Sequence, residues 1–336
     1  MHGVRRQKKQ TDLSQDQRQK EQTKIRDYRS VVDDLLERNQ NDVYDQISFD
    51  LTTKALQLNP ELYTAWNYRR KILLRGLFPN STQVTVHNLL LSDLNMTTVF
   101  LKSFPKVYWI WTHRRWCLDN IPSGPGGSED GKEDITWRRE AWERELMLVE
   151  KMLSMDARNY HAWNYRRLAL SFLPPDSVVP HSRDSELAYT KKKIEANFSN
   201  FSAWHQRTKF MGSGPFVGGE KEMAAEFDLV NQALWTDPAD QSSWLYHRFL
   251  ISKTNNEPDI IRREMTLLRD LHDLEPEAKW PMDTLVYYAS ILIHSSSTDV
   301  EERVRLKSDA EGWLDRLEVV DEGRKERYRA IKTGLN

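Results

Sequence analysis

Cysteine is almost absent from this chain of 336 residues, in which Cys117 is the single example. One cysteine cannot form an internal disulfide or a paired-cysteine metal site. Cys117 lies in RRWCLDN, among apolar residues with helical spacing, and we expect a buried structural thiol. The signatures HExxH and GxSxG are missing, as is a glycine-rich phosphate loop. The sequence therefore offers no recognisable, self-sufficient active site.

Long apolar runs and a strong excess of one charge are also missing. No run approaches the roughly 18–20 apolar residues that span a bilayer. The 49 basic residues nearly balance the 50 acidic ones, whereas a general nucleic-acid binder usually has a basic excess. The N-terminal segment is charged and has no apolar core, unlike a secretory signal. We expect a cytoplasmic protein with a flexible basic arm over residues 1–24.

Tryptophan, in contrast, recurs in a fixed motif. The motif is found in LYTAWNYRR (62–70), VYWIWTHRR (107–115), NYHAWNYRR (159–167), FSAWHQRTK (201–209) and SSWLYHRFL (242–250). The repeated residues, spaced by 45, 52, 41 and 40, are Trp66, Trp111, Trp163, Trp204 and Trp244. Periods in the forties are typical of stacked helical hairpins. Connections rich in glycine or proline, at 121–134, 172–185 and 212–220, interrupt the series.

Helical periodicity within each unit completes the fold prediction. Apolar residues over 139–156 recur at steps of three and four, which predicts one amphipathic helix before the motif. Proline precedes Trp by six residues in three units, and we expect it in the first helical turn. We predict an all-α fold, a right-handed superhelical solenoid of six or seven antiparallel helical hairpins. It forms one domain over residues 25–336, with a degenerate C-terminal cap around Trp280.

The motif also predicts how neighbouring hairpins are joined. Each repeated Trp is expected to fill the seam between two hairpins, because one hairpin cannot bury its apolar face alone. Arginine three or four residues later lies one turn on, over the indole, where it can reach a carboxylate. We interpret His113 and His205 as seam residues. We interpret the following arginines as structural clamps, with an anion-binding row as the alternative: Arg69, Arg70, Arg114, Arg115, Arg166 and Arg167.

This repeated unit resembles that of the α subunits of protein prenyltransferases. The resemblance covers roughly residues 45–290, and its register, helix break and arginine pair recur together. NFSNFSAWHQR (197–207) and TDPADQSSWLYHR (236–248) resemble the branch that serves Rab geranylgeranyltransferase, in the short form found in fungi. The Pro-rich N-terminal extension typical of the farnesyltransferase branch is missing.

The resemblance implies a heterodimeric transferase of geranylgeranyl groups. Its β subunit would hold the zinc and the lipid cavity, where a Rab cysteine thiolate attacks geranylgeranyl diphosphate. The α subunit would scaffold the β subunit and stabilise the leaving diphosphate. Rab GTPases and the Rab escort protein are the further partners that the resemblance implies.

The same resemblance points to particular residues of this chain. At five positions before Trp, the second repeat has Lys106, where the other copies have Glu61, Arg158, Ser199 and Ala239. Lys106 matches the family position that reaches toward the diphosphate, together with Tyr108 and, from the next repeat, His161. Asn159 and Tyr160 are expected beside the same mouth. Helix N-termini carry partial positive charge and bind phosphate readily.

Two further expectations concern the metal and the choice of enzyme. His2, on the basic arm, is a potential ligand that caps the open position of the β subunit's zinc. The alternatives are the α subunit shared by farnesyltransferase and geranylgeranyltransferase type I, and a helical-repeat scaffold without a catalytic role.

Overall fold

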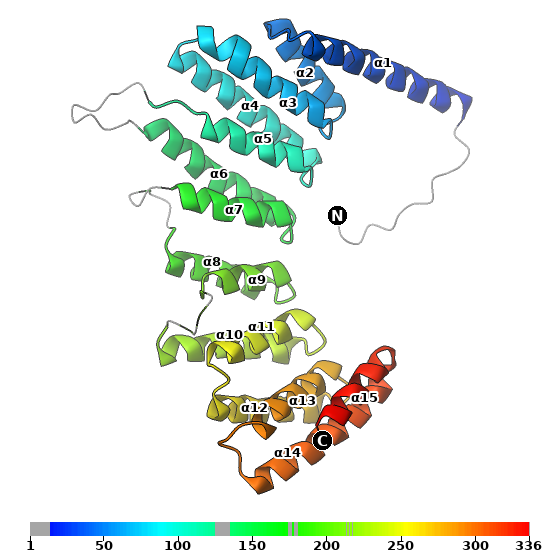
Figure 1. Cartoon of the computed structure of the whole chain (residues 1–336), viewed down its shortest axis with the longest axis vertical. Coiled ribbons are helices and arrows are strands. Elements are labelled where there is room, and N and C mark those ends of the chain that lie inside the picture. The colour runs from blue at the N-terminus through cyan, green and yellow to red at the C-terminus, as the bar shows by residue number, and fades with distance from the viewer. Residues whose placement is uncertain are drawn as a thin grey trace, which may run out of the picture. The chain divides into compact units, whose positions relative to one another are not determined.

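A computed structural model describes residues 14–124, 135–173, 177, 181–212, 214, 216 and 218–335. These residues form fifteen α-helices and no strand, which confirms the predicted all-α repeat fold (Figure 1). The chain divides into two compact units, residues 1–181 and 182–336, where we expected a single domain over 25–336. The boundary falls in the proline-rich connection after the third motif. No described helix has the length and apolar character that crossing a membrane requires.

The first unit consists of one long helix followed by three hairpins. Its helices are α1 (Gln15–Gln40), α2 (Gln46–Leu58), α3 (Tyr63–Ile72), α4 (Gln83–Ser103), α5 (Tyr108–Asp119), α6 (Thr136–Met155) and α7 (Tyr160–Phe172). A π-helical turn (Leu73–Leu77) and a 3-10 turn (Phe78–Asn80) follow α3. Helices α2 and α3, α4 and α5, and α6 and α7 pack pairwise, so each motif occupies the second helix of its hairpin.

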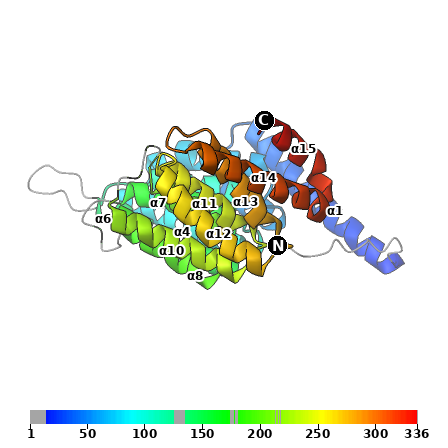
Figure 2. The same ribbon diagram turned by 90° about the horizontal axis from the view of Figure 1, so that it is seen from below.

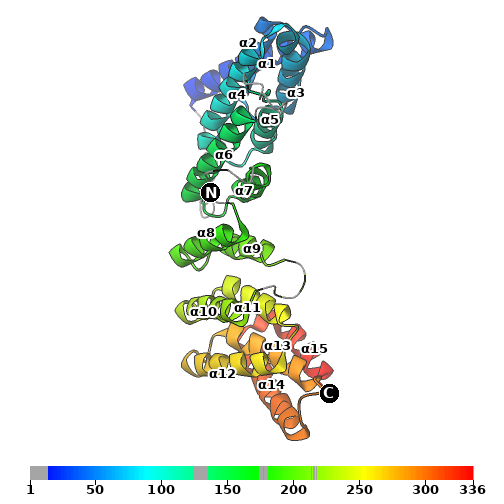
Figure 3. The ribbon, with the colours of Figure 1, turned by 90° about the vertical axis from the view of Figure 1, so that its left-hand side faces the viewer.

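The second unit continues the same pairing and ends in a cap. Its helices are α8 (Arg183–Ala196), α9 (Phe201–Lys209), α10 (Glu220–Thr236), α11 (Gln241–Lys253), α12 (Pro258–Leu274), α13 (Lys279–Ile293), α14 (Val300–Val320) and α15 (Lys325–Gly334), with a 3-10 turn at Glu322–Arg324. Figure 2 shows α10 and α12 along one side of this unit and α11 and α13 along the other. Figure 3 shows the hairpins of each unit as successive layers.

Connections within hairpins are uniform, whereas connections between hairpins vary. Six hairpins join their two helices through four residues each, at 59–62, 104–107, 156–159, 197–200, 237–240 and 275–278. In four of these turns the first residue's side chain accepts the N–H of the third residue at 3.0–3.1 Å, as Asn59, Asp156, Asn197 and Asp237 show. Asn and Asp favour such turns because their side chains imitate a backbone acceptor.

Each repeated Trp fastens its helix to the preceding turn. The indole N–H donates to the carbonyl six residues earlier, at 2.7–3.0 Å, in all five repeats: Pro60, Pro105, Ala157, Phe198 and Pro238. The prolines therefore lie in the turn and not in the first helical turn as predicted, because the second helix begins three residues before Trp. The indole also meets the next hairpin, as in the contacts of Trp66 with His113 (4.6 Å between ring centroids) and Trp204 with Tyr246 (4.6 Å).

The first arginine of the motif is a clamp that joins three helices. Arg114 is buried, donates to Glu145 of the next hairpin at 2.7 Å, and donates to Thr97 and Thr98 of its own hairpin at 2.8 Å. Arg69 and Arg207 make equivalent contacts. The clamp prediction is thus confirmed for Arg69 and Arg114, and the structure adds Arg207, which was not predicted as a clamp.

The stacking prediction is wrong for Arg69. Its guanidinium lies over Phe49 of α2, 3.7 Å from the ring centroid. The indole of Trp66 faces the Pro60 carbonyl and the aromatic side chains of the next hairpin. The arginine therefore packs on the first helix of its own hairpin.

The two ends of the described chain differ from their predicted boundaries. Helix α1 begins at Gln15, so that residues 15–24, which we assigned to the flexible arm, are helical and exposed. A capping box at Ser14 and Gln17 satisfies the first N–H groups and accounts for this start. In α13, Met282 lies six residues after Pro276 and is fully buried, so it occupies the place of the repeated Trp. Trp280 lies two positions earlier, out of register with the other repeats.

Candidate functional site

Two adjacent turns of the first unit, 104–107 and 156–159, bring the predicted site residues together. The ammonium of Lys106, in the turn before α5, lies 3.1 Å from Oδ2 of Asp156, in the turn before α7. The Lys106 side chain is 42% exposed, so its charge is held by one carboxylate and still faces solvent. Partial burial opposes ionisation of Asp156, but Lys106 and the Arg158 N–H outweigh it and lower the pKa of Asp156.

Asn159 connects these two turns from the inside. Its Oδ1 accepts the N–H of Ala162 and caps α7, and its Nδ2 donates to the Pro105 carbonyl at 3.3 Å. The same carbonyl accepts the indole N–H of Trp111. Asn159 is 1% exposed, so most of its side chain lies beneath the surface of the two turns. Its amide is used in capping, and it holds the two turns that carry Lys106 and Asp156.

Aromatic side chains contact one another at the starts of α5 and α7, next to the turn that carries Lys106. His161 meets Tyr108 edge-to-face, with 4.2 Å between ring centroids, and lies parallel to Trp111 at 6.3 Å. Tyr108 and Tyr160 are the first residues of α5 and α7 and are both largely exposed. Burial, and secondarily the charge of Lys106, lower the pKa of His161, although the Lys106 carbonyl opposes this. The lowered pKa favours the neutral imidazole of His161 at pH 7.

A depression of about 570 Å³ opens beside the same turns. Its lining combines apolar and basic side chains: Lys102, Ser103, Pro105, Met152, Met155, Asp156, Ala157, Arg158 and Asn159. The exposed end of Met155 and the ammonium of Lys102 give it a mixed character. The surroundings of the Lys106–Asp156 pair thus suit a ligand that has both apolar and anionic parts.

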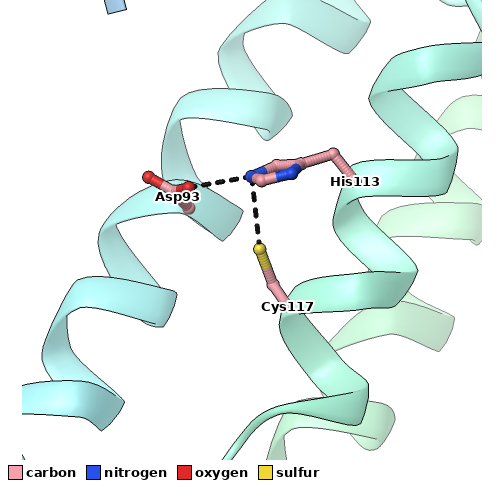
Figure 4. A group of neighbouring side chains, drawn as sticks. All are labelled: Asp93, His113 and Cys117. Atoms are coloured by element: carbon pink, nitrogen blue, oxygen red, sulfur yellow. Dashed lines mark hydrogen bonds and ion pairs between the residues drawn. The ribbon is translucent and has the colours of Figure 1, made fainter. Parts of the chain in front are cut away.

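A second cluster of reactive side chains lies in the interior of the first unit. Asp93 of α4 and His113 and Cys117 of α5 are all buried, with 2.8 Å from His113 Nε2 to Asp93 Oδ2 and 3.5 Å to Cys117 Sγ (Figure 4). These three residue types can bind a metal ion. However, Asp93 also accepts two hydrogen bonds from Arg69, and the guanidinium would repel a cation at the same carboxylate.

The repeat explains this cluster as a structural element. Arg207, Glu226 and Tyr246 form the equivalent network in the second unit, and Tyr246 has the position in its motif that His113 has in the second repeat. Although burial opposes its ionisation, Arg69 and then His113 lower the pKa of Asp93 to about 2. Burial raises the pKa of Cys117 well above its usual value, which confirms the predicted buried structural thiol.

The predicted site residues are thus placed as follows. Lys106, Tyr108, Tyr160 and His161 lie around one rim of the first unit, and Asn159 lies beneath it. His2 lies outside the described residues. Sequence reasoning missed Asp156. Its signal was the polar residue that recurs seven positions before Trp, as Asn59, Asp156, Asn197 and Asp237.

Comparison with known proteins gives one consistent result. A family model described as "Protein prenyltransferase alpha subunit repeat" matches residues 47–76, 90–121, 142–173, 183–213 and 223–254. A protein of Schizosaccharomyces pombe named "Geranylgeranyl transferase type-2 subunit alpha" is 34% identical, over 100% of this chain and 99% of its own. The protein of that name from Saccharomyces cerevisiae is 32% identical, over 98% of both chains.

Among solved structures, the fold is similar to a chain of the "Candida albicans protein geranylgeranyltransferase-I complexed with GGPP". The TM-score is 0.69 at 20% identity, and the match covers 93% of this chain and 91% of the other. At that identity the match supports the fold and not the substrate.

Proposed function

Since this chain belongs to the family of protein prenyltransferase α subunits, and within it to the geranylgeranyl transferase type-2 α subunits, we propose that it serves Rab geranylgeranyltransferase. That enzyme transfers a geranylgeranyl group from geranylgeranyl diphosphate to C-terminal cysteines of Rab GTPases. It works in the cytoplasm as a heterodimer with a β subunit, and the Rab escort protein presents the substrates.

The proposed reaction divides the chemistry between the two subunits. A zinc ion, which the β subunit would hold, would keep the Rab cysteine in its thiolate form, with the proton released to solvent. The new C–S bond forms at C1 of the lipid as the C–O bond breaks, and the bonding electron pair leaves with the diphosphate. Negative charge therefore grows on the diphosphate oxygens, and groups that stabilise it there accelerate the reaction. Stabilising that charge is the task we assign to the α chain.

The observation that carries this proposal is the placement of Lys106. It is the one lysine among five equivalent turn positions, and its ammonium faces solvent immediately before the N-terminus of α5. The exposed phenol groups of Tyr108 and Tyr160 and the neutral ring of His161 supply further N–H and O–H donors around it. Asn159 acts by holding the two turns together.

Exposed aromatic residues of the first unit support the heterodimer. The residue three positions before Trp is aromatic and exposed in each of its three repeats, as Tyr63, Tyr108 and Tyr160. Apolar side chains that gather on an exposed face mark partner surfaces. We propose that the β subunit covers them and buries more than roughly 2,000 Å², the size at which permanent complexes begin.

Single-turnover kinetics of the purified heterodimer test the proposal. A charge-assisted contact to the diphosphate contributes roughly 1.5–3 kcal/mol, so Lys106→Ala should slow lipid transfer by about 10- to 150-fold. Lys106→Arg should restore only part of the rate, because guanidinium does not fit the place of an ammonium. Lys151→Ala, the same change on the exposed face of α6, is the matched control. An unchanged rate in Lys106→Ala, with the heterodimer intact, would refute the role.

The identity of the copurifying partner tests the enzyme assignment. The tagged chain, expressed with each candidate β subunit, should yield lipid transfer to a Rab protein only with the type-2 partner. Transfer of farnesyl with a farnesyltransferase β subunit would instead support the shared α subunit. A stable complex without transfer would support a scaffold.

A further inference from the structure

The Lys106–Asp156 ion pair occurs at one junction between repeats and has no counterpart at the others. In each unit the third residue of one turn can be compared with the first residue of the next turn. These pairs are Glu61 and Phe104, Lys106 and Asp156, Ser199 and Asp237, and Ala239 and Glu275. Of these junctions, one combines a cation with a carboxylate. The repeat itself therefore does not require this pair.

Asp156 is held more firmly than the lysine that it contacts. Its backbone N–H donates to the Met152 carbonyl at 3.0 Å, and its Oδ1 accepts the N–H of Arg158 at 3.1 Å. Its other oxygen faces the ammonium of Lys106. A lysine side chain has several rotatable bonds and, when exposed, samples many positions. A carboxylate anchored to the backbone on one side restricts those positions on the other.

We propose that Asp156 is a positioning residue that directs Lys106 toward the leaving diphosphate. This inference rests on the function proposed above. An ammonium has three donors, so Lys106 can keep its contact with Asp156 and still donate to the ligand. The carboxylate restricts the ammonium before the reaction starts, which raises the rate of the chemical step. It also repels a bound diphosphate, which weakens binding of the ground state.

The structural role of Asp156 can be separated from this positioning role. Asn59 and Asn197 form the same turn in other repeats, where their side-chain oxygens accept the backbone N–H groups of Glu61 and Ser199 at 3.0 Å. Asp156→Asn should therefore keep the turn and remove the negative charge. Asp237→Asn makes the same change in a turn whose neighbouring position has Ser199. It is thus a matched control without a lysine.

The experiment measures the full heterodimer with geranylgeranyl diphosphate and a Rab substrate. An exposed ion pair is worth a few tenths to one kilocalorie, so Asp156→Asn should lower the single-turnover rate about two- to fivefold. The dissociation constant of geranylgeranyl diphosphate should stay equal or fall. Loss of structure alone would raise it. Asp237→Asn should change neither quantity.

A double-mutant cycle with Lys106→Ala decides whether the effect passes through the lysine. The effect of Asp156→Asn should vanish when Lys106 is absent. An equal effect in both backgrounds, no effect in the intact background, or a raised dissociation constant would overturn the positioning role while leaving the proposed function standing. If Lys106→Ala itself reacts at the normal rate, both the proposed function of Lys106 and this inference fail.

Discussion

The arginine clamp makes a quantitative prediction about stability. Arg114 and Glu145 are both buried, and the guanidinium also satisfies Thr97 and Thr98. Arg114→Ala would leave the Glu145 carboxylate buried without its cation, which costs about 3–5 kcal/mol. For a unit of this size, each kilocalorie lowers the melting temperature by about 2–4 °C, so we expect a fall of about 6–20 °C. The neighbouring Arg115 pairs with Asp119 at the surface, and Arg115→Ala should cost less than about 0.5 kcal/mol.

Urea unfolding of the full chain, followed by far-UV circular dichroism, measures both changes. A double variant, Arg114→Leu with Glu145→Leu, adds a sharper test. Because it removes both charges together, it should be more stable than Arg114→Ala. The reasoning would be refuted if Arg114→Ala cost no more than Arg115→Ala. It would also be refuted if the loss of stability in the double variant equalled the sum of the losses in the single variants Arg114→Leu and Glu145→Leu.

Three further predictions concern the turns and two histidines. Trp111→Phe removes the N–H that binds the Pro105 carbonyl and should cost about 1–3 kcal/mol, whereas Trp235→Phe, at an exposed position, should be nearly silent in the same thermal melt. Asn159→Ala should cost about 1 kcal/mol as a lost helix cap, and Asn159→Ser should recover most of it in urea titrations. Burial lowers the pKa of His113 and of His161, so the unfolded chain binds more protons below its own histidine pKa of about 6.5. Stability should therefore fall as the pH drops from about 7 to 5, and His113→Gln should flatten that slope; a slope of the opposite sign would contradict it.

Much of the fold was predictable because the repeat is encoded in side chains that every hairpin needs. The Trp register, the helix pairs and the clamp role of Arg69 and Arg114 followed from spacing alone. The hydrogen-bond partner of the indole N–H could not be predicted from the spacing, because it is a backbone carbonyl and every residue has one. The position of the prolines was predicted wrongly because a proline six residues before Trp suits a turn as well as a first helical turn.

The candidate site was predictable one residue at a time but not as an arrangement. Lys106 differs in charge from its equivalents in the other repeats, and that difference is visible in the sequence. Its partner Asp156 resembles its equivalents, since a polar residue forms the turn in several repeats. Which turn faces which depends on how the hairpins pack. The burial of Asn159 was not predicted for a related reason, because neither capping nor burial can be read from a residue's type.

The four-residue turns also bear on how such a chain can diverge. The six hairpin turns have the same length. The connections that follow the second helix of a hairpin differ in length, from the four residues 254–257 to the much longer segment 120–135. Differences in length are thus accommodated in the connections between hairpins. The turns within hairpins, one of which carries Lys106, differ from repeat to repeat in their residues and not in their length. The same difference guides the placement of inserted residues. A tag or reporter domain placed between α5 and α6 should leave the turn 104–107 undisturbed, whereas a single residue added within that turn should shift Lys106 and Tyr108 together.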